Sequence, residues 1–451
     1  MIRRRRVAAI ALCVGFAVGI AGQMNGNVSL PDLIGSLGDK AVNSQPGQNS
    51  SNQAASSVPM VDQQTGRLAA VQVLLSARAA AVKSGDKSLW MATVDLPGSS
   101  FRRRQSLGFD NLVKLPLGQF TYGAARLAPA LSATRVRQAG PKAWAATVTG
   151  TYTLAGLDRA PQSFEATYTL VQRPGGWRMV DDADGASPLQ MWDLPGMRVV
   201  RGKSVLVIGN APASRMRDYS AIADSAVRRV SGYWGTVWSS HVVLVTPSTS
   251  EQFARLLARS GGEGLDQVAA ITQGVVEAGQ QAQGDRVVIN PTAFTALQPA
   301  GRRVVITHEL THVATRSSTD SPVPIWLAEG MADYVGYSGL DLPRERVARE
   351  LITLVRAGKG PTRLPTDVDF DPAQSKIAPS YSASWLAVSR LVDLYGRARV
   401  VAFYRLVASA PTAGQADPDA TASLAFPRSF GVTEAQFVEG WKRYLGTLAL
   451  R

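Results

Sequence analysis

Five consecutive residues near the middle of the chain combine side chains that can bind a metal ion. His308-Glu309-Leu310-Thr311-His312 lies within RRVVITHELTHVAT, where apolar residues recur at helical spacing. Residues four apart lie one above the other on a helix, so both imidazoles point the same way, as two ligands of one zinc ion require. Glu309 follows the first histidine directly and is placed to act on a water held by the metal. The pattern predicts the site of a zinc-dependent hydrolase.

A third protein ligand is needed, because catalytic zinc sites keep one position open for water. The remaining histidine, His241, begins an expected strand well before the motif and is a poor candidate. After His312 comes PIWLAEGMADYVGY (324–337), an expected second helix that follows a proline-containing turn. Glu329 in this helix is the candidate third ligand. Asp333, one turn further along the same face, is expected to accept the ring N–H of one zinc-bound histidine.

The two motifs together, HELTH and then WLAEGMADY, resemble those of the gluzincin metallopeptidases, specifically the peptidase MA-like domain. The resemblance implies that His308, His312 and Glu329 bind zinc and that Glu309 is the general base. Metzincins have a third motif histidine instead, and the residues that follow His312, VATRSSTDS, contain none.

Two later segments extend this resemblance. SYSASWLAVSRLVDLYG (380–396) and FGVTEAQFVEGWKRYL (430–445) are similar to the family's C-terminal helices. The resemblance therefore covers residues 196–451 and implies a thermolysin-like zincin domain, with a mixed sheet and a helical C-terminal part.

The expected reaction is hydrolysis of a peptide bond. Zinc lowers the pKa of a bound water toward about 7, and Glu309 accepts the water's proton during attack on the carbonyl. The charge on the carbonyl oxygen needs a further donor, for which Tyr381 is the candidate and Tyr334 the second choice, although core packing is the commoner role of a tyrosine. The alternative function is a membrane-tethered binding or scaffold protein with a non-catalytic zincin domain, which has no physical need for Glu309.

The elements around the motif predict the domain that positions it. Segments 204–209, 241–247 and 286–294 have the apolar pattern of short buried strands, and the segment 217–235 that separates the first two is an amphipathic helix. Alternating strands and helices predict a mixed sheet. Beyond Arg302 the pattern is almost entirely helical.

Residues 66–190 form a separate predicted α+β domain. A helix over 67–86 precedes strand-like segments at 120–127, 143–154 and 164–182, the last broken by a Pro-Gly-Gly turn. This order resembles the cone-shaped nuclear transport factor-like (SnoaL-like) fold. It contains no histidine and no evident acid–base pair, so a packing or partner-binding module is expected.

The N-terminus has the pattern of an export signal. Four arginines at 3–6 precede an apolar stretch over 7–22, too short as a helix to cross a hydrocarbon core of about 30 Å without strain. Residues 1–22 are thus expected to be a signal peptide or a membrane anchor. Residues 23–65, rich in Asn, Gln and Ser, are expected to be a disordered linker. The protein is expected to be extracytoplasmic, either secreted or anchored to the membrane.

Composition excludes several classes of protein. A chain of 451 residues with 45% hydrophobic and 18% charged residues is neither a polytopic membrane protein nor wholly disordered. The net charge of +14 is scattered, and no nucleic-acid-binding signature accompanies it, so no nucleic-acid partner is expected. The expected partner is the peptide or protein substrate of the predicted zinc site. The run Arg102 to Arg104 is expected to be a solvated loop. Cys13 is the one cysteine, which excludes disulfides and thiolate metal sites.

Overall fold

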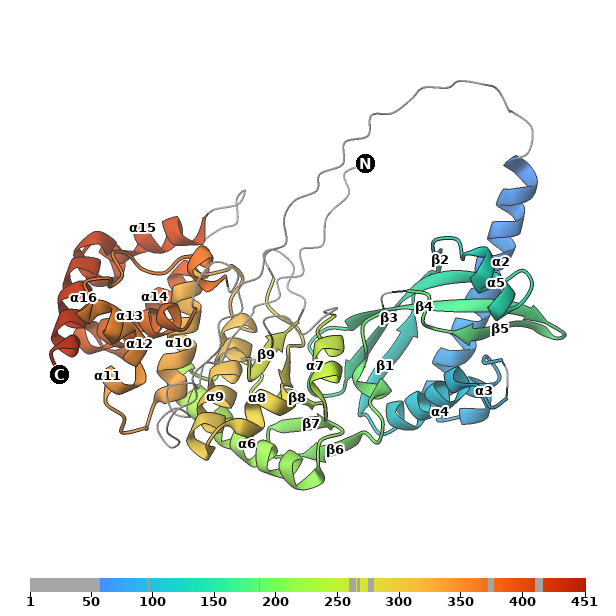
Figure 1. The fold of residues 1–451 in the computed structure, drawn as a ribbon, viewed down its shortest axis with the longest axis horizontal. Coiled ribbons are helices and arrows are strands. Elements are labelled where there is room, and N and C mark those ends of the chain that lie inside the picture. Colours follow the sequence, from blue (N-terminus) through green and yellow to red (C-terminus); the bar gives the residue numbers. More distant parts are fainter. Residues whose placement is uncertain are drawn as a thin grey trace, which may run out of the picture.

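The computed structural model describes residues 57–95, 97–185, 187–258, 265, 268–274, 280–371, 377–409 and 417–451. They form an α+β protein in which two sheets are followed by a helical C-terminal part (Figure 1). The predicted leader 1–22 and most of the predicted linker lie outside the described residues. No described helix combines the length and the apolar character needed to cross a membrane.

The first part of the protein consists of helices beside an antiparallel sheet. Its elements are α2 (Ser57–Ser84), α3 (Lys87–Met91), α4 (Ser100–Leu112), β1 (Leu117–Tyr122), β2 (Arg126–Leu127), α5 (Ala133–Ala139), β3 (Trp144–Leu154), β4 (Gln162–Arg173) and β5 (Gly176–Asp181). The strands lie in the order β1-β3-β4-β5, and β2 also pairs with β3. A short 3-10 helix, η1 (Met191–Asp193), leads to the second part.

Two details of this part differ from the sequence-based expectation. Helix α2 begins at Ser57, so residues 57–65 of the predicted linker are helical. The run Arg102 to Arg104 lies in helix α4 and not in a loop. Arg102 donates to the carbonyl of Val94 at 2.9 Å, and Arg104 pairs with Asp182 at 2.5 Å. These contacts hold α4 against its neighbours.

The second part contains a mixed five-stranded sheet. Its elements are β6 (Arg198–Arg201), β7 (Val205–Gly209), α6 (Ala213–Trp234), β8 (Val242–Thr246), α7 (Ser250–Leu256), β9 (Ala270–Gln273), β10 (Arg286–Ile289), α8 (Pro291–Ala296) and α9 (Pro299–Arg316). The strand order is β6-β7-β8-β10-β9. The three central strands are parallel, and β6 and β9 run antiparallel to their neighbours at the two edges.

Both faces of this second sheet are buried. Alternate side chains of a strand point to opposite faces. One set packs with α6 and α9: Val205, Val207, Val242, Leu244, Val287 and Ile289. The other set packs against Trp90, Phe109, Tyr152 and Phe164 of the first part: Leu206, Ile208, Val243, Val245 and Val288. The first part therefore covers the face of the sheet opposite helix α9.

Polar contacts reinforce this junction between the two parts. Arg286 on β10 forms a bidentate ion pair with Asp158, at 2.7 and 2.8 Å, and the exposed fractions of the two side chains are 8% and 0%. The next residue, Arg159, donates to the carbonyl of Ser317, directly after α9, at 2.9 Å. The loop between β3 and β4 thus contacts the end of the helix that carries the HELTH motif.

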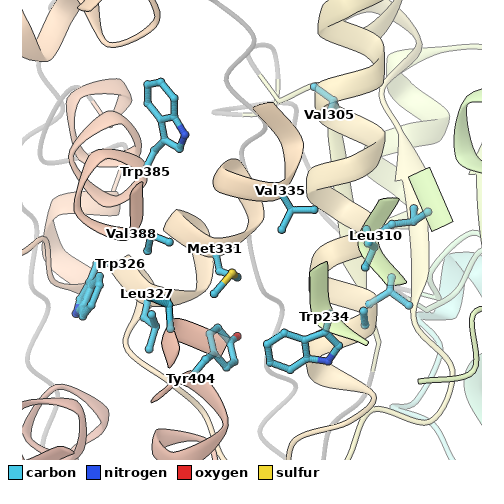
Figure 2. Close-up of a cluster of buried hydrophobic side chains, with 14 of the residues drawn as sticks. Trp234, Val305, Leu310, Trp326, Leu327, Met331, Val335, Trp385, Val388 and Tyr404 are labelled. Carbon is cyan, nitrogen blue, oxygen red and sulfur yellow. The ribbon is translucent and has the colours of Figure 1, made fainter. Parts of the chain in front are cut away.

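In the rest of the described residues, the regular elements are all helices. They are α10 (Ile325–Tyr337), α11 (Arg344–Val347), α12 (Arg349–Arg356), η2 (Asp367–Phe370), α13 (Ala378–Tyr395), α14 (Arg397–Val407), α15 (Pro418–Phe430) and α16 (Glu434–Ala449). Apolar side chains of α9, α10 and α13 form one core, in which Figure 2 shows Leu310, Met331 and Val388. This packing sets α10 beside α9.

Glycine is required where α10 crosses α13. A Cβ on Gly330 would lie 2.4 Å from the Ser384 carbonyl oxygen and 2.7 Å from Val388 Cγ2. We expect Gly330→Ala to lower the free energy of unfolding by about 1–3 kcal/mol, because the two helices must move apart. Urea unfolding measures this change. The control is Gly446→Ala in α16, where nothing lies within 4 Å of the added carbon and a gain of about 0.5–1 kcal/mol is expected. Equal stability of the two variants would contradict the close crossing.

Candidate metal centre

Helix α9 presents both histidines of the HELTH motif to the interior. It begins at Pro299, in the first turn, where the missing N–H is no loss, and continues without a break to Arg316. His308 is 0% and His312 3% exposed. Their Nε2 atoms lie 3.1 Å apart, as the spacing of four residues on a helix allows.

Glu329 of helix α10 completes a group of three donors. Its Oε2 lies 3.2 Å from His308 Nε2 and 3.5 Å from His312 Nε2. Among the described residues, this is the group of His, Cys, Asp and Glu side chains that could hold a metal ion. All three side chains are buried.

The donor set fits zinc. Three donors at about 2.0–2.1 Å from one zinc ion, in tetrahedral arrangement, lie about 3.3 Å from one another. The three separations of 3.1, 3.2 and 3.5 Å agree with that value. Glu329 Oε2 is buried and makes no hydrogen bond within the described part of the chain, although two imidazole nitrogens are close. A cation between the three atoms would satisfy all of them at once.

Asp333 determines which nitrogen of His308 carries the proton. Asp333 Oδ1 lies 2.7 Å from His308 Nδ1. An ionised carboxylate only accepts, so the Nδ1–H of His308 is the donor in this contact, and Nε2 is the ring nitrogen left for a metal ion beside Glu329 and His312. Asp333 and Glu329 are four residues apart on α10. One helix therefore supplies both the third metal donor, Glu329, and the carboxylate that orients His308.

We expect Asp333→Ala to weaken zinc binding by about 10–100-fold without abolishing it, because the ring of His308 loses its orientation but all three donors remain. Competition with a chelating zinc indicator measures the affinity. Asp341→Ala, a carboxylate later in the chain that belongs to no donor group, is the control and should leave the affinity unchanged. Unaltered binding by Asp333→Ala would show that this contact does not orient the ligand.

Glu309 lies beside the three donors and is completely buried. Its Oε2 accepts a hydrogen bond of 2.7 Å from Thr272 Oγ1. Its Oε1 has no hydrogen-bond partner among the described residues. One carboxylate oxygen is therefore held, and the other remains for a reacting molecule.

Sequence reasoning missed Thr272 and the strand that carries it. Strand β9 has only four residues, and two small alanines, Ala269 and Ala270, stand at its start, so it gave no strong periodic pattern. The available signal was the β-branched pair Ile271-Thr272 within the short apolar run VAAIT (268–272).

Burial and mutual charge shift the pKa values at the centre. Burial raises the pKa of Glu309 to about 8, against the opposing effects of His308 and of the Thr272 hydrogen bond. Burial acts the same way on Glu329, but the two histidines lower the pKa of that carboxyl to about 2. Burial lowers the pKa of His312. The pKa values of the two carboxyl groups on neighbouring helices thus shift in opposite directions, because burial dominates at Glu309 and the two histidines dominate at Glu329.

The other residues considered from the sequence, Tyr381, Tyr334 and His241, are not members of the three-donor group. Tyr381 on α13 is 4% exposed, and its ring packs edge-on against Phe370, with the ring centroids 5.0 Å apart. Tyr334 on α10 packs edge-on against Tyr233 of α6 at 5.8 Å. A role in stabilising an oxyanion stays a prediction for both. His241 is exposed, its Nδ1 lies 2.7 Å from the carbonyl of Ser239, and it is not part of the donor group.

No family model and no curated protein matches this sequence. Among solved structures, yeast LTA4 hydrolase in complex with bestatin is 13% identical, with a TM-score of 0.29, over 55% of this chain and 36% of that one. A mutant of a two-domain M1 zinc metallopeptidase bound to L-arginine is 14% identical, with a TM-score of 0.31, over 67% and 61% of the two chains. A mutant of an M1 zinc metallopeptidase from Deinococcus radiodurans is 15% identical, with a TM-score of 0.31, over 66% and 61%. This chain spans less than two thirds of each, and TM-scores this low assign neither a fold nor a family.

Proposed function

We propose that this protein is a zinc-dependent peptidase of the gluzincin type, with a thermolysin-like arrangement of helices α9 and α10. His308, His312 and Glu329 hold the zinc ion, and Glu309 is the general base. The proposal rests on the arrangement of four buried side chains. Three buried donors lie 3.1–3.5 Å apart, and beside them is a buried carboxylate with one oxygen that has no partner among the described residues.

The bound zinc ion would supply a Lewis acid that polarises the peptide carbonyl and acidifies the attacking water. Glu309 Oε1 takes one proton from this water as the water oxygen forms a bond to the carbonyl carbon. Glu309 then passes the proton to the amide nitrogen as the C–N bond breaks, which yields a carboxylic acid and an amine. Asp333 holds His308 in the required tautomer throughout.

A zinc-bound scaffold without activity is the competing function. A scaffold of this kind accounts for the three metal donors, but it gives no reason for a buried carboxylate at Glu309. A buried carboxylate is costly unless it is paired, and the Thr272 hydroxyl satisfies only one of its two oxygens. The free-energy cost of burying Glu309 with one oxygen unpaired among the described residues is explained if that oxygen accepts and returns a proton during catalysis. The arrangement of the site therefore favours an enzyme over a scaffold.

The test is metal content together with cleavage of casein. The intact protein should contain one zinc ion per chain and should degrade casein, and a chelator such as 1,10-phenanthroline should remove both the metal and the activity. Added zinc should restore them. Stoichiometric zinc with no cleavage of casein or of a mixed peptide library would favour the scaffold.

We also propose that the protein acts outside the cytoplasm. Four arginines followed by the apolar stretch 7–22 support export, and the Asn-, Gln- and Ser-rich composition of residues 23–56 suits a spacer. Fractionation of cells that express the full chain, with N-terminal sequencing of the product, distinguishes a cleaved leader from an anchor. Recovery of the full-length chain in the cytoplasm contradicts export.

A further inference from the structure

We propose that Thr272 is the positioning residue of the general base: its hydroxyl holds Glu309 Oε2, so that Oε1 is the oxygen that receives and returns the proton. This inference rests on the proposed peptidase function and adds to it a residue from outside both sequence motifs. The hydrogen bonds of the Thr272 hydroxyl go to Glu309 and not to the three metal donors, so Thr272 acts through Glu309.

The Thr272 hydroxyl donates to one particular acceptor, the side-chain oxygen Oε2 of Glu309. Thr272 is 0% exposed, and its Oγ1 lies 2.7 Å from Glu309 Oε2. The backbone carbonyl of Glu309 is the other acceptor within reach, at the longer distance of 3.2 Å. A hydroxyl has one proton to donate, and an ionised carboxylate is the stronger acceptor. The hydrogen bond to Oε2 is therefore the one made while Glu309 is ionised.

The sheet sets the position of Thr272 independently of Glu309. Thr272 pairs with Val287 in the antiparallel ladder between β9 and β10. Its neighbours on the strand reveal which face it occupies. Ile271 belongs to the core shared with the first part of the chain, and Ala270 belongs to the core around α9. Alternation therefore places the Thr272 side chain on the face toward α9.

A second link holds β9 and α9 in register. Arg316, in the last turn of α9, donates to the carbonyl of Gly274, directly after β9, at 3.2 Å. It also forms a bidentate ion pair with Asp285, directly before β10, at 2.8 and 3.1 Å. Strand and helix are thus joined at Thr272–Glu309 and again at Gly274–Arg316. The hydroxyl is in place before any substrate arrives.

This hydrogen bond restricts the orientation of the Glu309 carboxylate. The terminal torsion of a glutamate is broad, so a carboxylate without such a bond can turn its plane through many orientations. With Oε2 held, the carboxylate plane has one orientation, and Oε1 is the oxygen without a partner among the described residues. A proton that arrives on Oε1 leaves the Thr272 hydrogen bond intact, so both protonation states of Glu309 keep the same position. Misplacement of a reacting group by about 1 Å can reduce the rate by roughly 100-fold.

The experiment compares Thr272→Val, which replaces the hydroxyl by a methyl of similar size, with Thr272→Ser, which keeps the hydroxyl. We expect Thr272→Val to lower kcat for a peptide substrate by about 10–100-fold, with KM and zinc affinity unchanged. Thr272→Ser should retain most of kcat. The matched control is Thr246→Val on β8, a threonine of the same sheet that is 1% exposed and whose hydroxyl donates to the carbonyl of Ile208. It should leave kcat unchanged.

A second readout does not depend on activity. In crystal structures of the zinc-loaded proteins, we expect the Glu309 carboxylate to be rotated or spread over several orientations in Thr272→Val and to be in place in Thr272→Ser. Thermal melts identify any variant that has lost its fold. In the Glu309→Gln background, Thr272→Val should cause no further loss of residual activity, because the two residues act as one unit.

Three outcomes would overturn the role of Thr272: normal kcat in Thr272→Val, equal loss in the Val and Ser variants, or an unmoved Glu309 in the crystal structure of Thr272→Val. A wild-type protein that holds zinc but cleaves no peptide would instead refute the proposed function, and the crystal structures would still decide whether Thr272 holds Glu309.

Discussion

Glu309→Gln is expected to lower kcat for peptide hydrolysis by about 10²–10⁴-fold or more while zinc stays bound at full stoichiometry. The amide has nearly the shape of the carboxylate and can still accept the hydrogen bond of Thr272, but it cannot take a proton from water. The three donors on His308, His312 and Glu329 are unchanged by the substitution. Loss of rate without loss of metal is therefore the signature of a missing base.

The measurement is kcat and KM on one peptide substrate, with zinc content from the same preparation. Glu251→Gln is the matched control, because its side chain is 80% exposed at the start of α7, outside the donor group, and it should behave as the wild type. Turnover near the wild-type rate in Glu309→Gln would show that another residue activates the water. Loss of zinc from this variant would instead show that Glu309 itself contributes to the metal centre.

Glu329→Ala is expected to bring nearly complete loss of bound metal, and with it of activity. Removal of this side chain leaves two imidazoles whose Nε2 atoms face each other at 3.1 Å with no anionic donor beside them. Zinc sites of this kind use three protein donors, and the carboxylate of Glu329 is the one that carries negative charge. The expected loss of zinc affinity exceeds that for Asp333→Ala. Glu329→Ala removes a metal donor, whereas Asp333→Ala removes only the carboxylate that orients the donor His308.

Zinc stoichiometry after dialysis measures this loss, and thermal unfolding provides a second measure. Zinc should raise the Tm of the wild type, because a ligand that binds only the folded state stabilises it, and should raise the Tm of Glu329→Ala far less. Glu439→Ala is the control, a carboxylate that is 61% exposed on α16 and pairs with Lys442. Zinc binding at full strength by Glu329→Ala would refute the gluzincin assignment.

The candidate site was predictable from the sequence wherever its geometry is local. His308 and His312 face the same way because of the helical repeat, and Glu329 and Asp333 share a face of the next helix for the same reason. Most strands of the second sheet were predictable as well, because central parallel strands are buried on both faces and read as short apolar runs. Boundaries were less predictable: α2 begins at Ser57, within the range expected to be a linker.

The sequence by itself determined that two helices carry five side chains suited to a zinc centre, because helical periodicity acts over a few residues. They are His308, Glu309, His312, Glu329 and Asp333. The tertiary structure alone decided three other features. It placed Glu329 within 3.2–3.5 Å of both imidazoles through the packing of α10 beside α9. It brought Thr272 from a four-residue edge strand to Glu309, across 37 positions in the sequence. It also set the first part of the chain on the face of the sheet away from α9, through a shared apolar core and the buried pair of Arg286 and Asp158. Such contacts depend on how whole elements fill space against one another, and no local pattern of residue types encodes that.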